Sequence, residues 1–68
     1  MQYSVIIEKG DSSYGAYVPD VPGCVAVGES RDETLELIKE ALVMHLEGMR
    51  KDGEQIPPPN SSAVVVEV

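Results

Sequence analysis

The first 28 residues contain three short apolar segments separated by turn-forming residues. A β-branched run within residues 3–8 predicts a first strand that is covered on much of both faces. Gly, Asp and Ser in residues 9–13 predict a turn, and residues 14–18 then return as a second strand. Residues 24–27 predict a third strand. The pattern therefore indicates a three-stranded antiparallel meander.

The second and third predicted strands are separated by Pro-Asp-Val-Pro-Gly, residues 19–23. Proline has no amide donor and a fixed φ, so Pro19 and Pro22 end one strand and stop its ladder. Gly23 supplies a backbone conformation that a side chain would resist. We therefore expect a turn that is rigid at its prolines and leads directly into the third strand.

Residues 31–51 carry a helical pattern with a defined start and end. Ser30 and Glu33 have capping-box spacing, in which the serine hydroxyl accepts from the Glu33 amide and the Glu33 side chain reaches back. Asp52-Gly53 then ends the helix, which is about 30 Å long at about 1.5 Å per residue. Its main apolar stripe comprises Leu35, Ile38, Leu42, Leu46 and Met49.

The apolar surface of this helix is wider than one sheet can cover. Further small or apolar residues lie beside the stripe and widen the apolar arc to about 200°, against the roughly 100° that packing on a sheet requires. We expect this flank to contact another protein molecule; partial exposure of Met and Ala is the simpler alternative. The histidine in this arc is expected to be packed, with one ring nitrogen hydrogen-bonded. The candidate interface residues on the helix are Leu37, Ala41, Met44, His45 and Gly48.

The C-terminal segment predicts an extended connector and a last strand. Residues 54–60 include three consecutive prolines and favour a stiff, extended chain. Residues 63–68 predict a valine-rich fourth strand, which could lie parallel to the first strand or pair with a neighbouring subunit. An uncovered valine-rich edge promotes aggregation, so we expect it to be paired. Val64 and Val66 are therefore further candidate interface residues, as is Tyr17 on the second strand.

Composition limits the chemistry and the partners. A chain of 68 residues suffices for a single domain, residues 1–68, and buries only about 60% of the surface of its unfolded form, so self-association is expected. The net charge of -7 disfavours direct nucleic-acid binding and suits a basic protein partner, or simply solubility. Cys24 and His45 are the only residues of their types, which excludes an internal disulfide and disfavours a metal site. With neither signal peptide nor membrane-spanning run, the sequence predicts a cytoplasmic protein.

Five segments resemble the HicB family of small antitoxin-like proteins and together extend over nearly the whole chain. The most specific feature is the combination of the Asp-x-Pro-Gly-Cys turn, the capped helix and an Ile-Pro-x-Pro exit. The resemblance implies an α+β fold of order β-β-β-α-β, a partial ribonuclease-H-like arrangement that assembles as dimers or tetramers. The matching segments are residues 3–7, 14–24, 28–33, 40–47 and 53–59.

The resemblance also implies a function. Family members typically bind a small basic ribonuclease toxin, HicA, and block its active site. Many carry a C-terminal DNA-binding domain, which is not found in these 68 residues, so promoter binding is not expected. We therefore expect a non-catalytic, oligomeric protein-binding module. The alternative is a stand-alone homo-oligomer that binds a small ligand or an unrelated protein.

A metal-dependent nuclease is the third possibility, and it requires carboxylates that converge on ions about 4 Å apart. The candidates Glu8, Asp20 and Asp32 each have a structural explanation, at a strand end, in the proline turn and at the helix start. Cys24 has no neighbouring Lys or Arg in sequence to activate its thiol. We therefore predict no catalytic, cofactor-binding or metal-binding residues.

Overall fold

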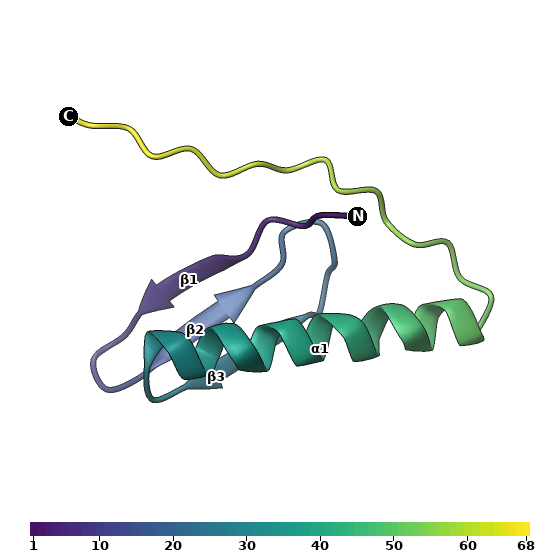
Figure 1. Cartoon of the computed structure of the whole chain (residues 1–68), viewed down its shortest axis with the longest axis horizontal. Coiled ribbons are helices and arrows are strands. Elements are labelled where there is room, and N and C mark those ends of the chain that lie inside the picture. Colours follow the sequence, from purple (N-terminus) through teal and green to yellow (C-terminus); the bar gives the residue numbers. More distant parts are fainter.

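A three-stranded sheet packs against one long helix in the computed structural model, which describes residues 1–68 (Figure 1). Strands β1 (Ile6–Lys9), β2 (Tyr14–Tyr17) and β3 (Val25–Gly28) precede helix α1 (Arg31–Lys51). Neighbouring strands are antiparallel and the order is β1-β2-β3, so β1 and β3 are edge strands. α1 packs against all three strands and most extensively against β3. The predicted α+β meander and long helix are confirmed.

The strand register decides which side chains share a face of the sheet. Ala16 of β2 is buried beneath α1, whereas its neighbour Tyr17 is exposed on the opposite face. Small side chains on the α1 side allow the helix to approach the strands closely. The row that faces α1 consists of Ile7, Ala16 and Ala26, and the row that faces away consists of Ile6, Tyr17 and Val25.

The proline turn between β2 and β3, together with the residue on either side of it, supplies half of the buried core. Val18, Val21 and Cys24 are each at most 2% exposed, because the turn folds its apolar side chains inward beneath α1. The Val21 amide donates to the Val18 carbonyl at 3.1 Å, and the Cys24 amide donates to the Val21 carbonyl at 3.2 Å. Gly23 adopts a φ of 85°, as its place in the turn predicts. The six core residues are Ala16, Val18, Val21, Cys24, Ile38 and Leu46.

Both ends of α1 are capped by the residues that the sequence indicated. The Ser30 hydroxyl accepts from the Glu33 amide at 3.1 Å. The Glu33 carboxylate reaches back one residue further than expected and accepts from the Glu29 amide, also at 3.1 Å. At the C-terminus, Gly53 has a φ of 74° and its amide donates to the Arg50 carbonyl, which completes a Schellman-type end.

The junction between β3 and α1 requires a glycine. A Cβ atom at Gly28 would lie 2.6 Å from Thr34 Oγ1 and 3.1 Å from the Thr34 backbone nitrogen. Thr34 is fully buried and its hydroxyl donates to the Ser30 carbonyl at 2.7 Å, so it has little room to move. The close approach of strand and helix therefore depends on the missing side chain at residue 28.

The predicted fourth strand does not form within the chain. Residues 63–68 lie extended but make no backbone hydrogen bond with β1, and all of their side chains are exposed. Just before them, the main-chain groups of Ser61 are bound to side chains and not to a strand. Pairing parallel to β1 in the same chain is thus not observed, and pairing with a neighbouring subunit stays a prediction.

Candidate functional site: exposed apolar surfaces and the C-terminal arm

The predicted interface residues on α1 fall into two groups, one exposed to solvent and one packed against the rest of the protein. Leu37 is 37% exposed and Met44 is 71% exposed, whereas Ala41 packs against the core. His45 is half-buried against the proline turn, where a Cβ atom at Gly23 would lie 3.8 Å from its Cε1. The ring makes no side-chain hydrogen bond, so the expected partner for a ring nitrogen is not found.

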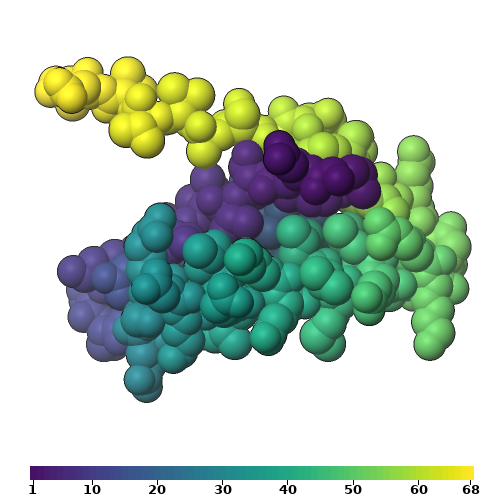
Figure 2. Space-filling model, viewed as in Figure 1, coloured from purple at the N-terminus to yellow at the C-terminus, as the bar shows by residue number.

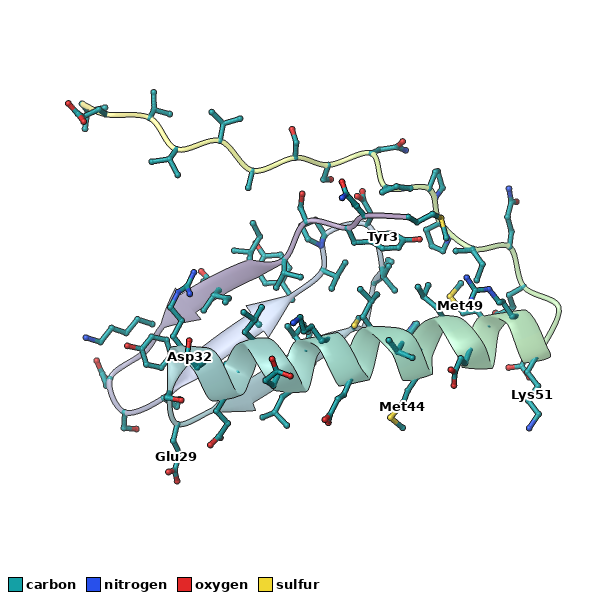
Figure 3. All side chains as sticks on the ribbon, viewed as in Figure 1. Tyr3, Glu29, Asp32, Met44, Met49 and Lys51 are labelled. Carbon is teal, nitrogen blue, oxygen red and sulfur yellow. The ribbon has the colours of Figure 1, made fainter.

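We call the outward-facing part of this surface, Leu37, Met44 and Gly48, the α1 flank. An added Cβ atom at Gly48 would meet nothing within 4 Å, which shows how open the surface is. Figure 3 shows Met44 and Met49 leaving opposite sides of α1, with Met49 directed toward the segment that carries Tyr3 and Met44 directed away from it.

Acidic side chains border the α1 flank. Glu40 and Glu47 follow Leu37 and Met44 by three residues each, so all four lie on one side of the helix. Both carboxylates are exposed. A shallow hollow lies at the edge of the flank, and Val43, which the sequence pattern had left outside the predicted interface, contributes to it. The hollow is lined by Lys39, Glu40, Val43 and Met44.

A second exposed apolar surface lies on the face of the sheet that points away from α1. Tyr17, a candidate interface residue from the sequence, is 40% exposed there. Val25 and Val27 are more exposed still, and the sequence reasoning missed them. The sequence feature that could have identified them is the alternation in residues 24–27. The small Cys24 and Ala26 point inward there, and both valines point outward.

The C-terminal arm, defined as residues 62–68, leaves the body of the protein at Ser61. The Ser61 amide donates to Asp20 Oδ2 at 2.8 Å and its hydroxyl donates to Asp20 Oδ1 at 2.9 Å. The Ser4 hydroxyl donates to the Ser61 carbonyl at 2.9 Å, and the Tyr3 hydroxyl donates to the Pro57 carbonyl. We call the contacts of Ser61 with Asp20 and Ser4 the Ser61 clamp.

Beyond the clamp the arm stands clear of the body (Figure 2). Val64 and Val66, both predicted interface residues, are 79% and 77% exposed. The structure therefore places the exposed candidate residues on three separate surfaces, the α1 flank, the outer face of the sheet and the arm, whereas Ala41 and His45 pack against the core and the proline turn.

The titratable side chains form no catalytic constellation. No group of three His, Cys, Asp or Glu side chains could hold a metal ion. Both carboxylate oxygens of Asp20 are engaged by Ser61, so this residue has a structural role. Cys24 is a free thiol in the core, and its burial raises its pKa above the ordinary value of 9.0. A protonated, enclosed thiol is a poor nucleophile.

α1 is not apolar enough to cross a membrane.

Comparison with known proteins agrees with this picture. Residues 3–67 match the family described as HicB_like antitoxin of bacterial toxin-antitoxin system. The chain belongs to the HicB-like antitoxin family. Antitoxins of this family are a non-catalytic class, and the prediction that the chain is not an enzyme is confirmed on that basis.

Two relatives show how the chain compares in length. A UPF0150 protein of Thermoplasma acidophilum is 40% identical over 67 residues, which are 97% of each chain. An uncharacterized 14.9 kDa protein of Haemophilus phage HP1 is 43% identical over 60 residues, which are 88% of this chain but 45% of the phage protein. This HicB-like chain therefore spans less than half of the phage relative.

Two solved structures share the fold. The N-terminal domain of the Burkholderia pseudomallei antitoxin HicB superimposes with a TM-score of 0.81 and 35% identity, covering 91% of this chain and 74% of that one. A chain of a HicA3 and HicB3 toxin-antitoxin complex superimposes with a TM-score of 0.73 and 28% identity, covering 87% of this chain and 70% of that one.

Proposed function

We propose that this HicB-like chain is an oligomeric antitoxin module that binds a small basic ribonuclease toxin of the HicA type and blocks its active site. The observation that carries the proposal is the likeness to a chain of a HicA3 and HicB3 toxin-antitoxin complex, within a family of antitoxins. The absence of a metal-binding or nucleophilic cluster fits a protein that acts by contact.

We further propose that the toxin docks on the α1 flank. Leu37 and Met44 offer exposed apolar area at the centre, and Glu40 and Glu47 border it with negative charge. A basic protein fits such a surface, because carboxylates at the rim accelerate encounter with Lys and Arg while the apolar centre gives lasting contact. Occlusion of the toxin's active site then follows from the bulk of α1 and needs no chemistry.

The test is complex formation with a HicA-type toxin expressed from the gene adjacent to the one that encodes this chain. A catalytically inactive form of the toxin permits both proteins to be purified. Calorimetry is expected to show a complex at micromolar concentration, with an affinity that falls as salt is raised. The absence of a complex at these concentrations, or of an adjacent gene for a short basic protein, would overturn the proposal.

Placement on the α1 flank is tested by a matched pair of charge substitutions. Met44→Asp lies on the flank, whereas Val27→Asp lies on the outer face of the sheet at nearly the same exposure, 67% against 71%. Met44→Asp is expected to weaken binding at least tenfold, and Val27→Asp to leave it within about twofold. The reverse result would move the toxin site to the sheet.

A further inference from the structure

The three methionines of the chain differ in how far solvent reaches their side chains. Met44, on the α1 flank, is 71% exposed, and Figure 3 shows it directed away from the body of the protein. Met49 leaves the opposite side of α1 and is half-buried, packed against the core. Met1 is about as exposed as Met44, but it lies at the N-terminus, outside the α1 flank. Met44 is therefore the exposed thioether of the proposed docking surface.

The sequence of α1 leaves this thioether open to small molecules. A helical side chain leans toward the N-terminus of its helix, so the residue four positions later usually covers part of the earlier one. Four positions after Met44 stands Gly48, which has no side chain, and an added Cβ atom there would meet nothing within 4 Å. Met44 also lines the shallow hollow at the edge of the flank. A small solute therefore reaches the sulfur without any change in the fold.

No exposed thiol competes with this thioether for an oxidant. Cys24 is the only cysteine of the chain, and it is 2% exposed within the core. Oxidation of sulfur in a folded protein follows the exposure of the sulfur atom. A peroxide that meets the folded chain therefore reaches the thioethers of Met44 and Met1 before it reaches the thiol.

We propose that Met44 is a reversible oxidation site, at which hydrogen peroxide weakens the binding of a basic protein partner to the α1 flank. The inference rests on the proposed function and adds a means of regulating it. In the reaction the thioether sulfur attacks one peroxide oxygen: an S–O bond forms, the O–O bond breaks, and after proton transfer one molecule of water leaves. Sulfur gives up two electrons and peroxide accepts them. The product is a polar, chiral sulfoxide, which methionine sulfoxide reductases return to the thioether.

A sulfoxide at residue 44 opposes the contact that the thioether favours. Met44 lies in the apolar centre of the flank, from which a docked partner displaces water. The sulfoxide oxygen accepts hydrogen bonds from water and loses them when this centre is covered. The bordering side chains of Glu40 and Glu47 are carboxylates, which accept hydrogen bonds but do not donate them. The Lys39 ammonium is paired with Glu36 at 3.6 Å. The flank therefore offers the sulfoxide no replacement donor, and affinity falls.

Peptide mapping by mass spectrometry tests the site. The full-length chain is treated with dilute hydrogen peroxide at neutral pH, and the oxidation of each methionine is followed with time. Met44 should be converted at least tenfold faster than Met49, with Met1 as the exposed reference. An added, catalytically inactive HicA-type toxin should slow the conversion of Met44 and leave that of Met1 unchanged. Equal rates at Met44 and Met49 would overturn the proposal.

Calorimetry with the inactive toxin tests the consequence for binding. The oxidised parent chain should bind at least fivefold more weakly than the untreated chain, and reductases A and B, each of which reduces one sulfoxide epimer, should restore the affinity. Met44→Leu is compared with its own untreated form and should not change on peroxide treatment, although its Met1 is still oxidised. Met49→Leu is the matched control, and it should lose affinity on treatment as the parent does.

The oxidation site and the proposed function fail in different ways. If the untreated chain binds no toxin, the proposed function fails, and the regulation of that binding fails with it. If the untreated chain binds and its affinity survives full conversion of Met44, the oxidation site alone is overturned. Weakening of Met44→Leu by peroxide to the same extent as the parent would also overturn the site alone.

Discussion

Asp20 and Ser61, 41 residues apart in the sequence, are joined by two hydrogen bonds to the two oxygens of one carboxylate. Asp20 lies in the proline turn that also buries Val18 and Val21, so the position of the turn is fixed by the core. Ser61 marks the point where the C-terminal arm leaves the body. The proline turn therefore determines where the exposed C-terminal arm begins.

Removing the Asp20 carboxylate should free the arm at little cost to the fold. Asp20→Ala deletes both hydrogen bonds to Ser61, and because these bonds are exposed to solvent the loss of unfolding free energy should be about 0.5–1.5 kcal/mol. Amide hydrogen exchange at Ser61 should accelerate well beyond that of α1. If the amide of Ser61 stays as protected in the variant as in the parent chain, the clamp is not what holds this segment.

The contact between Gly28 and Thr34 predicts a sharp contrast between two glycines. Gly28→Ala places a methyl group 2.6 Å from the Thr34 hydroxyl, and the buried junction must shift, at a cost of about 1–3 kcal/mol. Gly48→Ala, on the exposed side of the last turn of α1, meets nothing within 4 Å and should stabilise the helix by about 0.5–1 kcal/mol. Urea unfolding of both variants measures the two effects. Equal effects would show that the junction is looser than described.

Burial of Cys24 predicts a dependence of stability on pH. Its pKa in the folded protein lies above 9.0, so between the two values the unfolded chain has lost the thiol proton while the folded protein retains it. The folded state then binds more protons, and the unfolding free energy should fall as pH rises past about 9, with no contribution from this thiol at neutral pH.

The measurement is urea unfolding of the parent chain and of Cys24→Ala at pH 7.5 and at pH values above 9. The substitution lowers stability at every pH because it leaves a small cavity, but its pH profile should be flatter than that of the parent. Identical slopes would mean that the thiol titrates normally in the folded protein. At neutral pH a thiol reagent should label Cys24 only as fast as the chain unfolds.

Local signals were enough to predict the elements that depend on neighbours in sequence. The Ser30 and Gly53 caps define α1, and the prolines and Gly23 define the turn, because each acts within a few residues of itself. The sequence did not show which of the predicted interface residues on α1 face inward and which face outward. Ala41 and His45 face the core and the turn, while Met44 faces outward, and this depends on which side of α1 meets the rest of the protein.

The pairing of the C-terminal arm could not be predicted from the sequence pattern. Valine-rich residues 63–68 have the propensity of a strand, but propensity does not state which edge a strand will use. The deciding contacts are those of Ser61 with Asp20 and Ser4, which are distant in sequence and polar. The outward valines of β3 were visible as an alternation, yet their significance depends on the absence of a second layer on that face of the sheet.

The central claim, that this chain neutralises a toxin by covering it, is tested most directly by RNA cleavage. The active HicA-type toxin is incubated with a labelled RNA and increasing amounts of the full-length chain, with Met44→Asp and Val27→Asp in parallel. Cleavage should stop near stoichiometric addition of the parent chain and of Val27→Asp, and should persist with Met44→Asp. Undiminished cleavage at a several-fold excess of the parent chain would contradict the account.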